Sequence, residues 1–256
     1  MIEIHAVLVG FLVAALVAMT GIGGGCLMAP ILVAGMGVPM PVAVGTDLLY
    51  STATKLAALA FYWRRGKVRW RVAALMLTGS LPAAVLALGA IWWMRSSAEG
   101  LTTLMSVSLA AALTLSAGAI FTRERLYDVN GDTSGGGGRS GRAAVITAGA
   151  AVGALVSLSS VGAGAIGVAA LLLIYSSLEL GEIIGTDLAH GVVLAALAAV
   201  GHAALGNVDF ALLANLLAGM IPGIWLGGRL TGWLPEPMLR RTISLLLLGS
   251  ALRLVA

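Results

Sequence analysis

The sequence has few charged residues, a single cysteine and none of the common catalytic motifs. Only 10% of its 256 residues are charged, and a lone cysteine, Cys26, excludes an internal disulfide framework and a metal site of several cysteines. Three scattered histidines, without a His-Glu-x-x-His or Gly-x-Ser-x-Gly pattern, argue against a metalloenzyme or a hydrolase. Gly66-Lys67 is followed by Val68, so a nucleotide-binding P-loop is excluded. We therefore expect no cofactor, no bound metal and no enzymatic activity.

Apolar residues are abundant instead. They make up 59% of the chain, and the mean hydropathy is +1.02, far above that of soluble domains. The apolar segments are often about 20 residues long, enough to cross the hydrocarbon core as a helix, and they lack the alternation of barrel strands. These features predict an all-α polytopic membrane protein. The predicted segments cover residues 2–19, 24–36, 42–63, 70–93, 101–122, 143–158, 163–176, 183–205, 209–230 and 238–255.

The basic residues are concentrated in three places. A net charge of +4 would favour a nucleic-acid partner in a soluble chain, but clustered basic residues between apolar segments mark cytoplasmic loops. We therefore expect these basic loops to face the cytoplasm, and we expect no nucleic-acid partner. Twelve of the fifteen basic residues form the clusters: Arg64, Arg65, Lys67, Arg69 and Arg71, then Arg123, Arg125, Arg139 and Arg142, then Arg229, Arg240 and Arg241.

The chain is predicted to be an internal duplication. Residues 126–142 form a polar, glycine-rich linker, expected in the cytoplasm, between repeats 1–125 and 143–256. A shift of 140 residues places the first Gly-Thr-Asp-Leu, which begins at Gly45, on the second, which begins at Gly185. The same shift also relates Gly66, Val68, Gly79, Pro82 and Leu86 to Gly206, Val208, Gly219, Pro222 and Leu226.

Loop charges favour an inverted duplication. The basic loop "RRGKVRW" has an uncharged and acidic mate, "LGNVDF", and the weakly charged region near Arg95 has a basic mate near Arg229. Inversion requires an odd number of crossings in each half. A broken or re-entrant helical hairpin followed by three transmembrane helices satisfies this requirement. The alternative is a parallel repeat of eight ordinary spans, and whether residues 2–19 span the bilayer or form one hairpin arm stays open.

Both predicted hairpins turn at glycine-rich stretches, "TGIGGGCLMAP" and "SLSSVGAGAIG". Each glycine costs about 1 kcal/mol inside a helix, so these stretches interrupt their helices. New helices then start near Gly25 and Gly164, where free N–H groups and the helix dipole favour an anion. Close helix packing is the alternative role of the glycines. The candidate substrate-binding residues, including nearby polar side chains, are Thr20, Gly23, Gly24, Gly25, Ser51, Lys55, Ser159, Ser160, Gly162 and Gly164; Ser157 also lies beside a turn.

Three charged residues lie well inside apolar segments: Asp47, Lys55 and Asp187. Such charges usually mark substrate or proton pathways. Lys55 could bind an anion or neutralise Asp47, with which it shares a helical face together with Ser51 and Thr54. Asp187 and His190 are three residues apart and could pass a proton, so Asp47, Asp187 and His190 are the candidate proton-coupling residues. Helix capping is the alternative for both aspartates. His202 is expected at the membrane interface.

These stretches also resemble the TauE/SafE family, called the sulfite exporter or 4-toluene sulfonate uptake permease family. The resemblance lies in "TGIGGGCLMAPILVAGMGVPMPVAVGTDLL" and its echo "SSVGAGAIGVAALLLIYSSLELGEIIGTDL". Thr20, Gly21, Gly23, Gly24, Gly25 and Pro30 match the first motif of the family, and Gly45 and Thr46 match the second. The resemblance implies a multi-pass secondary transporter of the bacterial inner membrane, for small sulfur-containing anions such as sulfite or sulfoacetate. Both halves have an aspartate where the family more often has a small neutral residue, which favours proton binding.

We therefore expect transport of a sulfur-containing anion by alternating access, coupled to protons. The direction is open, with export favoured. The competing hypotheses are an anion channel lined by the hairpins and, with less support, a membrane scaffold or enzyme. The expected partners are the anion and the lipid bilayer, and a homodimer is an open alternative.

Overall fold

The computed structural model describes residues 3–20, 25–130, 139–175, 177–230 and 236–255. Within these ranges the secondary structure is helical, without strands, as predicted. Each predicted apolar segment is a helix, and α2 continues into a short π-helix, η1. The elements are α1 (Ile4–Thr20), α2 (Gly25–Pro30), η1 (Ile31–Gly35), α3 (Met40–Arg64), α4 (Trp70–Met94), α5 (Ala98–Asn130), α6 (Arg139–Ser159), α7 (Ala165–Ile174), α8 (Leu180–Ala204), α9 (Phe210–Leu230) and α10 (Glu236–Val255).

The predicted linker is shorter than expected from its composition. Helix α5 continues to Asn130 and α6 already begins at Arg139, so both ends of the predicted stretch 126–142 are helical. Residues 131–138, which contain the glycine run, lie outside the described ranges. Polar side chains at these helix ends lowered the hydropathy without stopping the helices.

Five helical segments are long and apolar enough to cross a membrane. They are Trp70–Met94, Ala98–Thr122, Gly141–Ser159, Leu180–Ala204 and Phe210–Leu230. The apolar helices beside the two predicted glycine turns include three shorter ones: Ile4–Met19, Cys26–Gly35 and Ala165–Ile174. Large apolar side chains such as Leu86, Trp93 and Leu252 are exposed on the outer faces, as expected for a surface in lipid.

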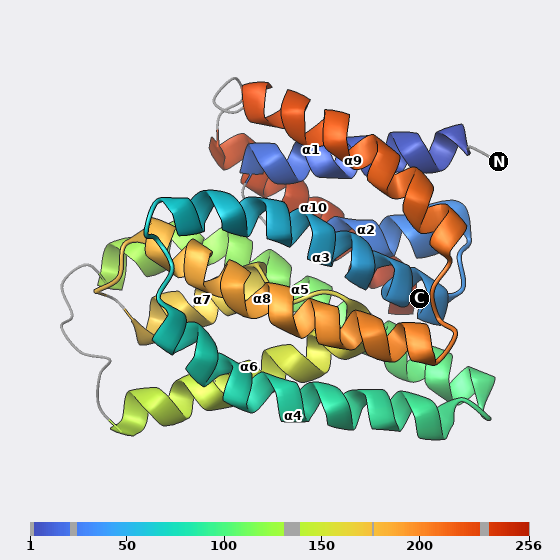
Figure 1. Cartoon of the computed structure of the whole chain (residues 1–256), viewed down its shortest axis with the longest axis horizontal. Coiled ribbons are helices and arrows are strands. Elements are labelled where there is room, and N and C mark those ends of the chain that lie inside the picture. The colour runs from blue at the N-terminus through green and yellow to red at the C-terminus, as the bar shows by residue number, and fades with distance from the viewer. Residues whose placement is uncertain (1–2, 21–24, 131–138, 176, 231–235, 256) are drawn as a thin grey trace.

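Helices pack in equivalent pairs. Helix α1 lies along α9, and α4 lies along α6 (Figure 1). Glycines permit both contacts: a Cβ at Gly79 would lie 2.0 Å from the Ile146 carbonyl oxygen, and one at Gly219 would lie 2.0 Å from that of Val7. Close packing is therefore the role of these two glycines, which the 140-residue shift relates.

Helices α3 and α8 run antiparallel and contact each other reciprocally. The Asp209 N–H, beyond the end of α8, donates to Thr46 Oγ1 near the start of α3 (3.1 Å). The Arg69 N–H, beyond the end of α3, donates to Thr186 Oγ1 near the start of α8 (3.0 Å). The preceding glycine, Gly45 or Gly185, allows each loop to approach closely. The first two residues of each Gly-Thr-Asp motif therefore hold the two helices together.

The predicted basic clusters are gathered at one end of the molecule. In Figure 1 the ends of α3, α5 and α9, and the starts of α4, α6 and α10, all lie at the left-hand end. The hairpin of α6 and α7 also begins and finishes there, whereas α1 begins, and α2 leads into α3, at the right-hand end. The two hairpins thus enter the bundle from opposite ends.

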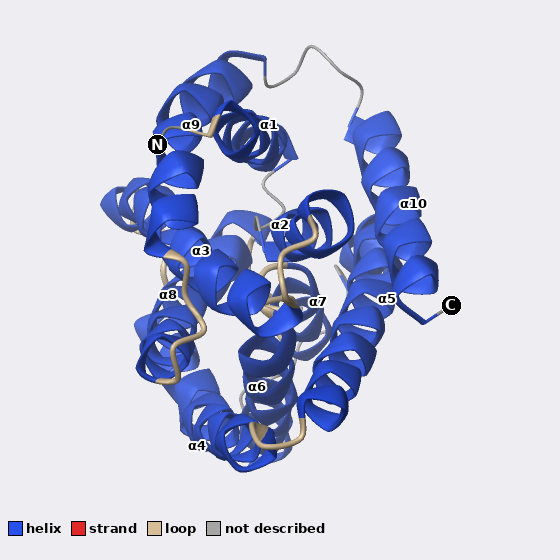
Figure 2. Ribbon diagram, turned by 90° about the vertical axis from the view of Figure 1, so that its right-hand side faces the viewer, coloured by secondary structure: helices blue, strands red, loops and turns tan. Residues whose placement is uncertain are grey.

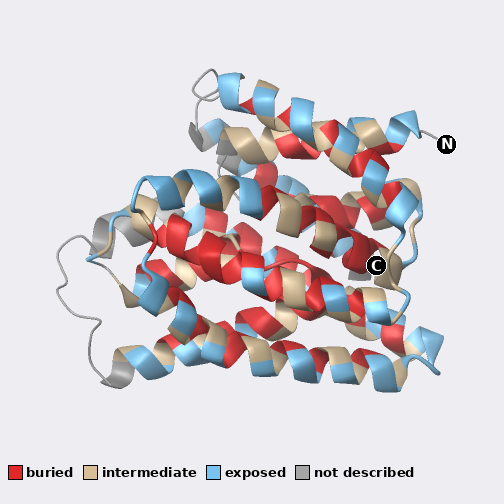
Figure 3. Ribbon diagram, viewed as in Figure 1, coloured by how far each residue is buried: buried red, intermediate tan, exposed pale blue. Residues whose placement is uncertain are grey.

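The core lies around the α3–α8 pair. Helix α8 has 72% of its most apolar window buried, against 33% for α4 and α9. Figure 3 shows the same distribution, with buried residues dense in the central helices. In the perpendicular view of Figure 2, α7 lies inside the bundle, where it packs against α5, α6 and α8. Polar groups on α3, α7 and α8 are therefore held away from lipid.

Candidate functional site

The three charged residues predicted inside the membrane come together in the centre of the bundle. Asp47, Lys55 and Asp187 are 0%, 3% and 1% exposed. The Lys55 ammonium interacts with the carboxylates of Asp187 and Asp47. One buried cation, contributed by α3, therefore serves two buried carboxylates, one from each half of the chain.

Lys55 is held in place along α3 and by α8. Its Nζ donates a hydrogen bond to Ser51 Oγ one turn earlier (2.6 Å), as expected because helical side chains point toward the N-terminus. Its aliphatic carbons lie against Gly191 of α8, where a Cβ would be 3.4 Å away. Thr54 Oγ1 donates to the Ser51 carbonyl oxygen (2.9 Å), so this hydroxyl is bound within its own helix.

The turn between α6 and α7 is the interrupted segment predicted from its glycines. Ser160, Gly162 and Gly164 have φ values of 61°, 129° and 119°, which glycine adopts readily and serine rarely. Ser159 Oγ accepts a hydrogen bond from the Val161 N–H (3.2 Å) and donates to the Leu155 carbonyl oxygen (2.6 Å). Of the predicted ligands, Ser159 therefore stabilises the turn.

The carboxylate of Asp187 lies at the start of α7. It faces the backbone N–H of Gly164 and the Lys55 ammonium. Its Oδ1 has no hydrogen-bond partner and lies directly over Gly167, where a Cβ would be 1.9 Å from it. The positive end of the α7 dipole, which the sequence predicted as an anion site, is thus next to an anionic group of the protein itself.

Asp47 faces the beginning of the turn, at Ser160. Neither of its carboxylate oxygens accepts a hydrogen bond of standard geometry; the groups that face it are the Ser160 hydroxyl, the Ala29 backbone and Lys55. Ser160 follows the last residue of α6, where free carbonyls carry partial negative charge. The two aspartates therefore share a lysine but have unlike surroundings.

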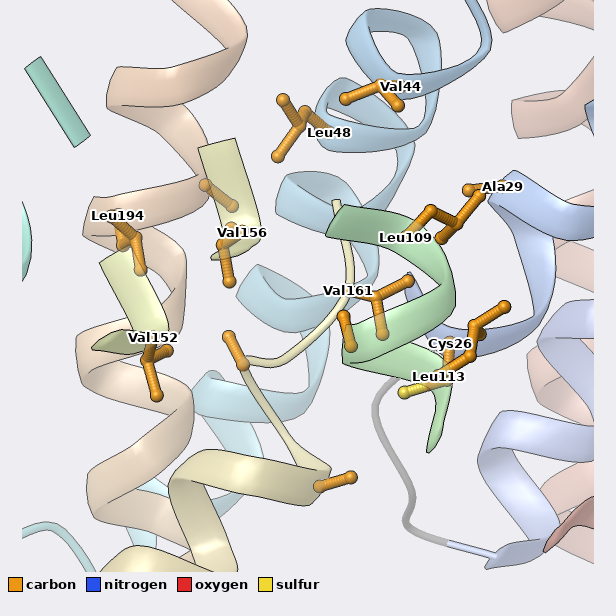
Figure 4. Close-up of a cluster of buried hydrophobic side chains, with 14 of the residues drawn as sticks. Cys26, Ala29, Val44, Leu48, Leu109, Leu113, Val152, Val156, Val161 and Leu194 are labelled. Carbon is orange, nitrogen blue, oxygen red and sulfur yellow. The ribbon is translucent and has the colours of Figure 1, made fainter. Parts of the chain in front are cut away.

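The start of α2 approaches the same turn. The Cys26 thiol faces Ser116 of α5 and the backbone of Gly162, and it lies near Lys55. Figure 4 shows Cys26 beside Leu113 and Val161 in the apolar cluster around the turn. Among the predicted ligands, Gly23 and Gly24 lie outside the described residues. Thr20 ends α1 and Gly25 begins α2.

Both buried histidines are hydrogen bonded. His190 Nε2 and Ser80 Oγ of α4 are 2.9 Å apart, and His190 lies near Lys55. His202, which is expected at the membrane interface, lies in the last turn of α8 and is buried by the protein. Its ring is 0% exposed, and Nε2 donates to the Ser157 carbonyl oxygen (2.9 Å). The partner of His202 therefore comes from α6, a helix distant in sequence from α8.

Asp47 and Asp187 do not cap their helices, so the capping alternative is wrong. Asp47 and Asp187 lie about two turns inside helices that begin at Met40 and Leu180. Helix α8 is capped instead by Glu179, in a reciprocal capping box with Glu182.

Sequence reasoning missed Gly167 and Gly191, which contact Asp187 and Lys55. It also missed Ser80 and Ser116, which face His190 and Cys26. Gly167 ends the same glycine-rich stretch as Gly162 and Gly164, and its place there could have indicated a close contact.

Several buried polar atoms near the turn have no partner within the described part of the chain. An unpaired polar group in a low-dielectric interior costs about 1–3 kcal/mol, so such a concentration is typical of a region that receives polar ligands. The unpaired atoms are both carboxylate oxygens of Asp47, Oδ1 of Asp187, the hydroxyls of Ser116, Ser157 and Ser160, and Nδ1 of His190 and His202.

Within the same described ranges, no group of three or more His, Cys, Asp or Glu side chains could hold a metal ion.

Comparison with known proteins assigns this arrangement to transporters. The family model "Sulfite exporter TauE/SafE" matches residues 6–254. The chain is 32% identical to the "Probable membrane transporter protein YjnA" of Bacillus subtilis (strain 168), over 99% of this chain and 100% of that protein. It is 24% identical to the "Probable membrane transporter protein YdhB" of the same organism, over 93% and 94% of the two chains. No solved structure matches.

Proposed function

Since the chain belongs to the TauE/SafE sulfite exporter family of membrane transporters, we propose that it exports small sulfur-containing anions, such as sulfite or sulfoacetate, across the bacterial inner membrane. The observation that carries this proposal is the position of Lys55 beside the start of α7. A buried ammonium and a helix N-terminus together form an environment for an oxyanion.

The proposed binding site lies at the α6–α7 turn. Lys55 supplies positive charge, the backbone of Gly162 and Gly164 supplies N–H donors, and Ser51 and Ser160 supply hydroxyls. From the first half we propose contributions by Thr20 and Gly25, which end α1 and begin α2, together with Gly23 and Gly24 of the same motif. This second contribution is supported by the approach of Cys26 to Gly162.

Transport is proposed to be coupled to protons. Asp47 and Asp187 are the carboxylates beside Lys55, and His190 lies one turn beyond Asp187. An anion that enters a site of low dielectric needs a compensating positive charge, and a proton on a carboxylate provides one.

We infer that the two halves are inverted repeats that open alternately. The reciprocal contacts of Thr46 with Asp209 and of Thr186 with Arg69 support this inference. Equivalent groups meet at opposite ends of the α3–α8 pair, so rocking of one half against the other would open one end while the other closes. The end that carries the basic clusters is assigned to the cytoplasm.

The test is uptake of labelled sulfite, sulfoacetate, taurine and thiosulfate into proteoliposomes, with and without a pH gradient. We expect uptake of at least one anion to saturate and to be stimulated by the gradient. Flux that does not saturate would favour an anion channel. Indifference to all four anions would overturn the proposed substrate class.

A further inference from the structure

The start of α7 is already occupied by a carboxylate. Asp187 faces the Gly164 N–H and Lys55, and its Oδ1 lies over Gly167, a position without a side chain. An oxyanion bound by the same N–H group and the same ammonium would need the space that this carboxylate fills. Asp187 and a substrate anion are therefore alternatives at one place.

Asp47 is placed differently. The Ser160 hydroxyl and the Ala29 backbone face it, but neither of its oxygens accepts a hydrogen bond of standard geometry, and it lies beside the negative end of α6 rather than the positive end of α7. Of the two carboxylates that share Lys55, Asp187 is thus the one suited to be ionised. Asp47 is the one suited to hold a proton in the resting state.

Charge balance then links anion binding to a proton. With Lys55 charged, Asp187 ionised and Asp47 protonated, the buried cluster is neutral. A bound monoanion adds one negative charge, and the cluster stays neutral only if Asp187 also becomes protonated. A net charge in a low-dielectric site is strongly unfavourable. The charged group that faces Asp187 is Lys55 from α3, and His190, on the same helix as Asp187, lies near the same ammonium and pairs with Ser80 of α4. Helices α4, α6 and α7 present only uncharged groups there.

We propose that Asp187 competes with the substrate anion for the start of α7, and that its protonation vacates the site. This inference rests on the proposed anion transport. The Asp187 carboxylate takes one proton from the side that is open, leaves the Gly164 N–H, and the anion takes its place against Lys55. Release reverses these steps. Each monoanion is therefore carried with one proton and the cycle moves no net charge, so export is driven by the outward concentration gradient of the anion and not by the inward proton gradient.

The first test needs no ligand. In the infrared spectrum of the purified wild-type protein at neutral pH, we expect a carboxylic acid C=O band from a buried acid. Asp47→Asn should remove this band, and Asp187→Asn should leave it. Acidification should add a second buried-acid band, which Asp187→Asn lacks. Loss of the neutral-pH band in Asp187→Asn, with retention in Asp47→Asn, would overturn the assignment whatever the substrate is.

The second test counts protons. The probe is methanesulfonate, which stays a monoanion at every pH used, and calorimetry in buffers of different ionisation enthalpy gives the protons taken up on binding. We expect one proton per anion for the wild type, with Kd rising tenfold per pH unit where Asp187 is ionised. Asp187→Asn should bind with no proton uptake and no pH slope. Asp47→Asn should keep the slope.

The outcomes separate the two proposals. Binding without proton uptake by the wild type overturns the competition, even if Asp187→Asn does not fold. Binding with an unchanged proton count in folded Asp187→Asn also overturns it. No binding of methanesulfonate or sulfite counts against the proposed function, and the infrared result then decides the state of Asp187 by itself.

Discussion

The carboxylate of Asp187 lies so close to Gly167 that a Cβ at this glycine would be 1.9 Å from Oδ1. The contact joins α8 to the first turn of α7, and it places an acidic group where a helix favours anions. A residue larger than glycine at this position must displace the carboxylate.

Gly167→Ala is therefore expected to destabilise the protein by about 1–3 kcal/mol through overpacking, and to impair transport. Thermal unfolding in detergent and uptake into proteoliposomes measure the two effects. Gly118→Ala is the matched control, because nothing lies within 4 Å of a Cβ there. Equal behaviour of the two variants would contradict the close contact.

Replacement of Lys55 by methionine should abolish transport and reduce stability. Loss of the ammonium leaves the buried carboxylates that it faces without a compensating charge, and an uncompensated buried charge costs about 3–5 kcal/mol. The same substitution at Lys67, which pairs with Glu179 at the surface, should leave transport intact. Uptake by folded Lys55→Met at the wild-type rate would exclude Lys55 from the site.

The reciprocal α3–α8 contacts predict equal effects in the two halves. Thr46→Val and Thr186→Val each remove the acceptor of one interhelical hydrogen bond and should each cost about 1 kcal/mol of stability. Denaturant unfolding of both variants and of Thr122→Val, whose hydroxyl bonds only within α5, gives the comparison. A large difference between the first two would argue against equivalent roles.

The surface pair of Lys67 and Glu179 predicts a pH dependence of stability. The hydrogen bond from Lys67 lowers the pKa of Glu179, and the same bond raises the pKa of Lys67. The stabilisation from Glu179 is thus present above its ordinary pKa and is lost as the pH falls through the lowered value. The stabilisation from Lys67 is lost as the pH rises through the raised pKa of this lysine.

Glu179→Gln should therefore lower Tm between about pH 5 and pH 10, and this difference should shrink in stronger acid. Both groups are largely exposed, so the difference should be small and should decrease with added salt. A difference that grows on acidification would contradict this sign.

The orientation of the chain can be tested with single cysteines. Arg65→Cys and Ser97→Cys introduce exposed thiols beyond the ends of α3 and α4, whereas the native Cys26 is buried. In right-side-out vesicles, a membrane-impermeant maleimide should label Cys introduced at 97 but not at 65. The reverse pattern would place the basic end outside.

The helices were predictable because a membrane constrains the sequence strongly. A span needs about 20 apolar residues, so hydropathy located nearly every helix end within a few residues. Asp47, Lys55 and Asp187 were found for the same reason, since charges inside apolar segments are rare and conspicuous. The glycine run before Ala165 likewise indicated the interruption between α6 and α7.

Contacts between distant segments were not predictable. The partner of His202 is a carbonyl in α6, and no local pattern identifies it. The occupation of the α7 start by Asp187 depends on how α8 is rotated against α7. The sequence placed an aspartate and a helix N-terminus in the same half of the chain, but only the packing brings them together.

The most direct test of the proposed site is anomalous diffraction from crystals loaded with selenite, a heavier analogue of sulfite, at acidic pH. We expect an anomalous peak at the start of α7, beside the Gly164 N–H and Lys55 Nζ, with the Asp187 side chain turned away. A peak elsewhere in the bundle, with the Asp187 carboxylate still over Gly167, would contradict the proposed site.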